Sequence, residues 1–311
     1  MKKYSIPFLI LPFLFSSCYD FFVQEVDLDQ ELGFEPKMVV NGIVNNEKEL
    51  TVFVGKTISY LDDSDQGVIG LENARIRVYK DGALILENPN SVQHGIFNND
   101  TVVNYPTQII GELGSTYRIE VEDDEFSKQA SATAHLMDTA DFEIVEVVEG
   151  AYINDYTWGA DTLDEWRVRL HDKPGNQAYI LGLSNRNKDP WDGAYAYFQT
   201  RDPLFGEYAQ TDPFYGSQFV AEGRYLTFDD DELDGQTFEF TILVPQGAWG
   251  GKPDRLIMNS MNKDLFHYLS LSQTQYWNQN NPFAEPVIIN SNVENGLGVF
   301  GAQIVQFRDT P

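Results

Sequence analysis

Short segments in which apolar residues occupy every second position make up much of the chain from Lys37 onward, and this alternation constrains the fold more than any other feature. Four of these segments are Met38–Val44, Leu50–Val54, Ala74–Tyr79 and Thr116–Glu122. A period of two is typical of antiparallel strands that bury one face. No helical stripe of apolar residues intervenes before about residue 135. We therefore predict an all-β fold.

The strand pattern falls into two regions, with a passage between them at His135–Ala140. Residues 37–140 combine short strands with turn signals such as Lys80-Asp81-Gly82, which predicts an N-terminal immunoglobulin-like β-sandwich. The Cys-Trp-Cys core of antibody domains is missing, so the prediction concerns the architecture alone. Residues 141–311 are predicted to form a larger β-rich domain. A core shared by the two regions remains an alternative.

One helix is predicted in the second region, over residues 262–277. Asp264 lies in its first turn, and Leu265, Tyr268, Leu269 and Tyr276 fall on one face at spacings near 3.6.

The first 18 residues have the form of a bacterial lipoprotein leader. Lys2 and Lys3 give a positive start, Ile6–Phe15 is an apolar run too short to span a membrane, and Ser16-Ser17 precedes Cys18. We expect residues 1–17 to be a signal peptide and the thiol of Cys18 to be lipidated. The alternative is an ordinary secretory signal with an incidental cysteine.

Residues 18–36 are acidic, lack a clean period and end in a proline, so we interpret them as a tether between lipid and globule. An edge strand at Phe21–Val26 is the alternative. The whole chain has 48 acidic and 21 basic residues, a net charge of −27. Such a field repels nucleic acid and anionic head groups and leaves the acyl chains as the membrane anchor. Cys18 is the single cysteine, so stability comes without a disulfide.

The tail of the chain resembles the signature of a known family. Asn281–Pro286 (NPFAEP) and Ser291–Gly301 (SNVENGLGVFG) are similar to the end of a family of Bacteroidota lipoproteins that is catalogued only as a domain of unknown function. Glu35–Gly42, Asn73–Tyr79 and Gly114–Val121 resemble earlier strands of the same family, so the resemblance covers nearly the whole mature chain. From the residues alone, the tail glycines favour structural closure over ligand binding.

The resemblance implies a location and a partner, and no catalytic residues. Members are expected to be outer-membrane lipoproteins, often encoded beside TonB-dependent receptors. We therefore expect a lipid-anchored outer-membrane protein, facing the cell surface, that partners such a receptor in nutrient uptake. A surface glycan- or peptide-binding protein and an assembly factor for outer-membrane proteins are the alternatives. A hydrolase is the enzymatic alternative, although the sequence has no H-E-x-x-H, G-x-S-x-G or P-loop motif.

Two acidic clusters have the composition of calcium sites, which use oxygen ligands. Asp62–Asp65 begins like an EF-hand loop but lacks its closing glutamate. The second cluster offers Asp229, Asp231 and Asp234, and solvated turns are the alternative for both.

Residues 191–219 contain nine aromatic side chains interleaved with Gly, Pro and Asp, which is typical of a folded loop. Tyr and Trp in loops supply rigid amphipathic contact area. A small core internal to the loop is the equal alternative. As candidates for partner or ligand binding we select Trp191, Tyr195, Tyr208, Tyr215 and the Gly-flanked Trp249.

Overall fold

The structure is a computed structural model that describes most of the chain from residue 34 onward. The described residues are 34–59, 68–89, 92–97, 100–138, 140–156, 159–186, 198–205, 221–223, 225–231, 233–247, 252–278, 285 and 287–310.

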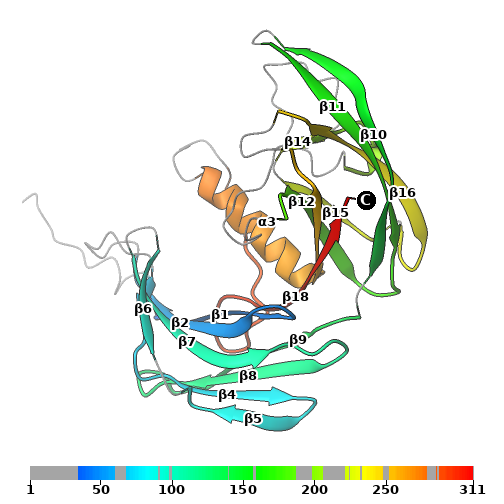
Figure 1. Ribbon diagram of the computed structural model, residues 1–311. Coiled ribbons are helices and arrows are strands. Elements are labelled where there is room, and N and C mark those ends of the chain that lie inside the picture. Colours follow the sequence, from blue (N-terminus) through cyan, green and yellow to red (C-terminus); the bar gives the residue numbers. More distant parts are fainter. Residues whose placement is uncertain are drawn as a thin grey trace, which may run out of the picture.

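One large sheet, sheet A, runs through the described part of the molecule (Figure 1). Its first and last strands in the sequence pair in parallel, with Gly42 opposite Phe300, and its other pairs are antiparallel. The strands in spatial order are β15 (Tyr225–Asp229), β12 (Gln177–Ser184), β17 (Arg255–Asn262), β18 (Phe300–Asp309), β1 (Met38–Asn45), β2 (Glu49–Thr57), β7 (Asp100–Ile110) and β6 (Gln93–Phe97), with β3 (Val68–Gly70) also beside β2.

Two smaller sheets complete the β structure. Sheet B has the order β5 (Ala83–Glu87), β4 (Arg75–Lys80), β8 (Thr116–Glu122) and β9 (Ala130–His135). Sheet C has the order β10 (Asp141–Tyr156), β11 (Gly159–His171), β16 (Thr237–Pro245), β13 (Phe198–Thr200) and β14 (Ala221–Gly223), and a short 3-10 helix, η2 (Pro203–Phe205), follows β13.

Both small sheets cover the same face of sheet A. Val44 lies opposite Ala302, Ile304 lies opposite Ser260, and Ser260 lies opposite Tyr179. Side chains two residues apart on a strand share a face, so this face continues from β1 across β18 and β17 to β12. Sheet B covers its β1–β2 side and sheet C its β12–β17 side. We call these two packed pairs the first and second sandwich.

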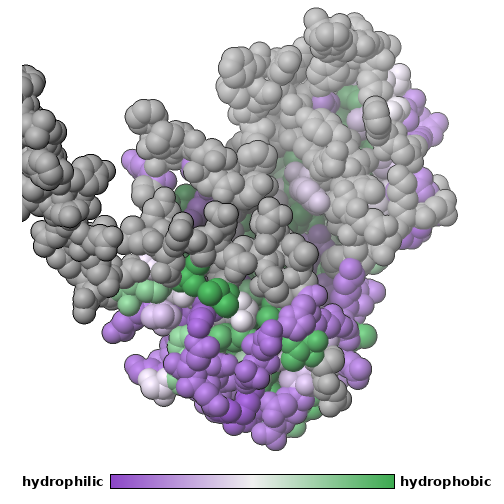
Figure 2. All heavy atoms as spheres, turned by 90° about the vertical axis from the view of Figure 1, so that its left-hand side faces the viewer, coloured by the Kyte–Doolittle hydropathy of each residue, from purple (hydrophilic) through white to green (hydrophobic). Residues whose placement is uncertain are grey.

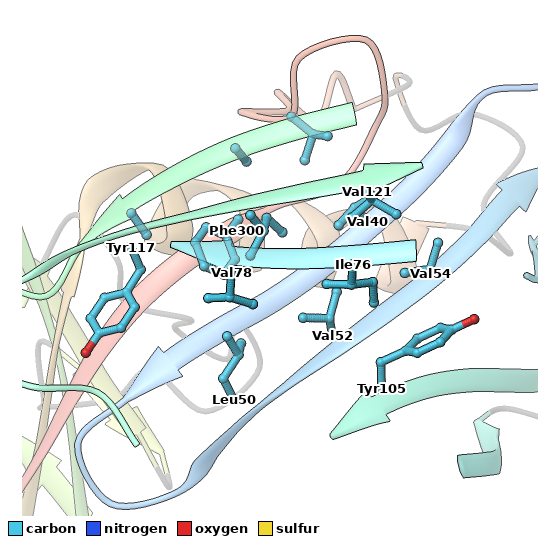
Figure 3. Close-up of a cluster of buried hydrophobic side chains, with 14 of the residues drawn as sticks. Val40, Leu50, Val52, Val54, Ile76, Val78, Tyr105, Tyr117, Val121 and Phe300 are labelled. Carbon is cyan, nitrogen blue, oxygen red and sulfur yellow. The ribbon is translucent and has the colours of Figure 1, made fainter. Parts of the chain in front are cut away.

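Each sandwich has its own hydrophobic core. The first core joins β1, β2, β4 and β8 and includes Val40, Val52, Ile76, Val121 and Phe300, all fully buried (Figure 3). The second core contains Trp166, Tyr179 and Met258 together with several phenylalanines. Strand β18 supplies Phe300, Ala302 and Ile304 to the first core while it pairs with β17 of the second sandwich. The passage near residue 140 therefore separates two cores but not sheet A.

Helix α3 (Lys263–Asn278) packs on the opposite face of sheet A. Its Leu265 and Phe266 join Ala178 and Met261 in a third cluster. At Gly301 a Cβ would lie 2.8 Å from the Leu265 side chain, so the helix rests directly on the β18 backbone. The prediction of an all-β fold is confirmed, and the predicted helix is present in the described part of the chain, over Lys263–Asn278. Within the described residues, no helix has the length and apolar character needed to cross a membrane.

The tail signature that marks the family resemblance closes the first sandwich. The Asn292 side chain accepts from the Phe300 N–H and donates to the Phe300 carbonyl, both at 2.9 Å. Val40 and Gly42 donate backbone hydrogen bonds to the carbonyls of Leu297 and Val299. These contacts fix the tail against β1, which agrees with a structural role for the tail.

Candidate binding site

Ion pairs cover much of the outer faces of sheets B and C, the faces turned away from sheet A. Exposed pairs of this kind stabilise a fold little, but they keep a sheet face hydrated. The pairs join Arg75, Arg77 and Arg118 to Glu120, Glu122 and Asp124 on sheet B, and Arg167 and Arg169 to Glu143, Glu146 and Glu239 on sheet C. Hydrophilic residues also predominate on the side of the first sandwich seen in Figure 2.

On sheet C the ion-paired rows give way to a cavity of about 410 Å³, which we call the sheet C hollow. Leu243 lies opposite Glu165, and Thr241 lies opposite Arg167, so the hollow is on the same outer face as the ion pairs. The residues that line it are Tyr152, Glu165, Arg201, Asp202, Pro203, Thr241 and Leu243.

The floor of the hollow is apolar although it lies on an outer face. Leu243 lines the hollow, and Leu163 and Tyr152 pack against it; both leucines are only 2% exposed. Tyr152 reaches this position through a bulge in β10, where the register with β11 shifts between Val148 and Tyr152. Gly150, inside the bulge, has a φ of 61°, a conformation that favours glycine.

The wall of the hollow is polar and charged. The guanidinium carbon of Arg201 lies 4.9 Å from the centre of the Tyr152 ring, a cation–π contact. The Tyr152 hydroxyl donates a hydrogen bond to Glu165, and this bond is the main reason why the pKa of Tyr152 is raised. The phenol therefore stays protonated at neutral pH and serves as a donor. The hollow thus presents an aromatic ring, a guanidinium and carboxylates around a small apolar floor.

Asp164, beside the hollow but on the inner side of β11, holds the neighbouring segments in place. Its carboxylate accepts from Gly150 N–H at 2.8 Å and from Gln246 Nε2 at 2.5 Å, and pairs with Lys252 Nζ at 2.9 Å. Burial would raise the pKa of Asp164, but Lys252, Gly150 and Gln246 outweigh burial and hold it below its usual value. Gln246 and Lys252 flank the segment that contains Trp249, so one carboxylate fixes both ends of it.

The acidic cluster in the structure is made of different carboxylates from those predicted to bind calcium. Oxygens of Asp172, Asp230 and Asp234 lie within 4.8 Å of one another. Of the three residues selected from sequence, only Asp234 belongs to this group. Asp229 accepts the N–H of Asp231 within their own turn, and Asp231 pairs with Lys263. These contacts place Asp229 and Asp231 outside the cluster.

Each carboxylate of the cluster already has a partner within the chain. Asp172 accepts from the Tyr179 hydroxyl and from Gly235 N–H, and burial raises its pKa. Asp230 accepts from Gln177 N–H and pairs with Lys263 Nζ, both at 2.8 Å, and Asp234 accepts from Gly175 N–H. Carboxylate oxygens suit calcium, but here they tie the start of β12 to the end of β15 and to helix α3.

The remaining sequence candidates lie outside the described residues. These are Cys18, the acidic residues 62–65, Trp191, Tyr195, Tyr208, Tyr215 and Trp249. In the described part of the aromatic segment, some side chains lie in the core and others line the hollow. Phe198 and Phe205 are buried in the second core, while Arg201, Asp202 and Pro203 between them line the hollow.

Sequence reasoning missed Tyr152, Glu165, Arg201 and Asp172. Tyr152 and Glu165 look like ordinary outward residues of strands, and their pairing appears only when β10 and β11 are in register. Arg201 lies inside the aromatic segment, where a single cation among rings was a usable signal.

Comparison with protein families matches residues 23–307 to a family model. The family is described as Domain of unknown function (DUF4249), and the match covers most of the chain, so the chain belongs to it. Comparison with curated proteins gives no match.

Proposed function

We propose that this DUF4249 protein is a non-catalytic lipoprotein of the outer membrane that partners a TonB-dependent receptor in nutrient uptake. The leader that ends at Cys18 supports the anchor. The resemblance to Bacteroidota lipoproteins supports the outer membrane and the receptor.

The observation that carries a binding role is the sheet C hollow. On a face otherwise occupied by ion pairs, Tyr152, Arg201 and Glu165 line a hollow together with Leu243, against which Leu163 packs. A polar rim around an apolar floor is the usual composition of a ligand site. The hollow is also continuous in sequence with the aromatic segment, since Arg201 and Pro203 belong to it.

Binding fits the chemistry of these residues better than catalysis does. The Tyr152 phenol donates to Glu165 and has a raised pKa, which makes it a poor nucleophile or base at neutral pH. Arg201 is stacked on the same ring. These groups hold and orient a ligand. A hydrolase stays the enzymatic alternative, and an activity screen of the purified protein would reveal it.

The receptor role can be tested by affinity purification of the tagged full-length lipoprotein in mild detergent. We expect a receptor barrel to be recovered with it. Alanine variants of Trp191, Tyr195, Tyr208, Tyr215 and Trp249 are expected to lose receptor while they keep their melting temperature. Recovery of no barrel, under conditions that preserve known barrel–lipoprotein pairs, would favour a stand-alone glycan- or peptide-binding protein or an assembly factor.

The anchor is tested separately. Labelling with a radioactive fatty acid should mark the parent protein and leave the Cys18→Ala variant unlabelled. Equal label in both proteins would refute lipidation at Cys18. Protease treatment of intact cells would then show whether the protein faces the cell surface.

A further inference from the structure

We infer that the sheet C hollow is a subsite for a neutral oligosaccharide, which it recognises through hydroxyl groups. The inference rests on the proposed binding function and adds the class of ligand.

The polar side chains of the hollow suit a ligand whose groups both donate and accept hydrogen bonds. Arg201 carries five N–H donors and no acceptor, whereas the carboxylates of Glu165 and Asp202 accept only. All three line one cavity. A ligand hydroxyl can accept from the guanidinium and donate to a carboxylate, so adjacent hydroxyls on one ring can satisfy both without any charge.

Charge argues against an acidic or a basic ligand. Two carboxylates and one guanidinium line the hollow, in a chain of net charge −27, which disfavours an acidic polymer. A basic side chain would seek the face of Tyr152, but Arg201 already lies over that ring at 4.9 Å. A neutral ligand avoids both conflicts.

The position of the hollow argues against a peptide that adds as a strand. The hollow lies over β11 and β16, and β11 pairs with β10 and β16 while β16 pairs with β11 and β13. At the hollow itself, Leu243 lies between Glu165 of β11 and Gln199 of β13, and the Thr241 carbonyl accepts from the Thr200 hydroxyl. The backbone there already has partners, so the ligand meets side chains. Pro203, which is exposed in the lining of the hollow, offers an apolar surface for the C–H face of a sugar ring. The cavity, at about 410 Å³, lies in the range of small-molecule sites.

The test is isothermal titration of the full-length lipoprotein in mild detergent with cellohexaose, xylohexaose, mannohexaose and maltohexaose, each at about 1 mM, a concentration that detects weak binding. Trigalacturonate and the peptide Gly-Lys-Gly are run beside them. We expect at least one neutral sugar to bind. Arg201→Lys keeps the charge but loses the planar fork, and should weaken this binding about tenfold or more. Tyr152→Phe keeps the packing and should weaken it by a smaller factor.

Arg167→Lys is the matched control, because Arg167 lies on the same face within the ion pairs, and its affinity and melting temperature should equal those of the parent. No binding of any of the four sugars, binding of the acidic sugar or the peptide instead, or unchanged affinity in Arg201→Lys would each overturn the inference. Receptor recovery is measured on the same preparations. If a receptor is recovered but no sugar binds, the oligosaccharide inference is refuted and the proposed receptor role stands. If a sugar binds but no receptor is recovered, the receptor role is refuted and the oligosaccharide inference stands.

Discussion

At the scale of single residues, Asp164 and Lys263 are charged groups whose partners lie in other segments of the chain. Asp164 is fully buried and joins β10, β11 and the segment after β16. Lys263, the first residue of helix α3, is held by Asp230 and Asp231. A buried ion pair adds little net stability when both partners are present. Removing one partner destabilises the fold strongly, because the other charge is left buried and unpaired.

We predict that Asp164→Asn lowers the free energy of unfolding by about 1–3 kcal/mol at pH 7, because Lys252 keeps only its exposed partner Glu149 and a buried acceptor is replaced by a donor. The pKa of Asp164 is lowered in the fold. Its contribution is therefore present above about pH 4, the range of an unperturbed aspartate, and is lost as the pH falls through the folded pKa. Urea unfolding from pH 7 down to pH 3 measures both effects.

The control for this variant is Asp141→Asn, an exposed carboxylate of the same sheet that pairs with Arg308 at 3.0 Å. It should change stability by less than about 1 kcal/mol. Equal losses of unfolding free energy in the two variants would show that the burial of Asp164 does not increase its contribution to stability.

Lys263→Met should destabilise the protein by about 3 kcal/mol at pH 7, because Asp230 is left buried without its cation. Burial would lower the pKa of Lys263, but Asp230 and Asp231 outweigh it, and the pKa is raised. The contribution of the pair is therefore present below about pH 10 and is lost as the pH rises through the folded pKa. The parent protein should accordingly approach the variant in stability at high pH, as measured by urea unfolding.

The same preparation decides the calcium question. Since Asp172, Asp230 and Asp234 each have a partner in the chain, we expect calcium chloride or a chelator to leave the melting temperature unchanged. A rise with calcium that Asp234→Asn abolishes would instead assign this cluster to a cation.

At the scale of elements, helix α3 packs directly against the backbone of strand β18. A Cβ at Gly301 would meet Leu265 at 2.8 Å, and Leu265 is fully buried. Glycine at this position lets the helix approach sheet A closely, which a strand residue with a side chain would prevent.

We predict that Gly301→Ala destabilises by about 1–3 kcal/mol through overpacking. Leu265→Ala alone should cost about 2–5 kcal/mol because it leaves a cavity. The double variant should cost less than the sum of the two, since the new methyl fills part of that cavity. Chemical unfolding of all four proteins measures the coupling. Strict additivity would mean that the helix does not rest on β18 at this point.

At the scale of the whole molecule, sheet A links both cores into one structure. All five tryptophans lie after residue 141, so tryptophan fluorescence reports on the second region alone. Leu50 is fully buried in the first core. We predict that Leu50→Ala, at a cost of about 2–5 kcal/mol, also shifts the fluorescence unfolding midpoint, because β18 belongs to both sandwiches.

Far-UV circular dichroism and fluorescence should give the same midpoint for this variant. An early dichroism change with an unshifted fluorescence transition would show that the two sandwiches unfold independently.

The sequence by itself determined the local features. The period of two marked β1, β2, β4 and β8, the spacing near 3.6 marked helix α3, and the family signature marked the closing tail. These patterns report which face of a segment is buried, and they extend over a few residues only.

Tertiary structure alone decided which segments meet. Gly42 lies opposite Phe300, Asp172 lies beside Asp230, and Arg201 stacks on Tyr152. None of these pairings follows from the residues themselves, because a half-buried strand has the same pattern whichever strand lies beside it. The choice depends on the packing of the whole chain, where burying both cores against one shared sheet is favourable only if the last strand lies next to the first.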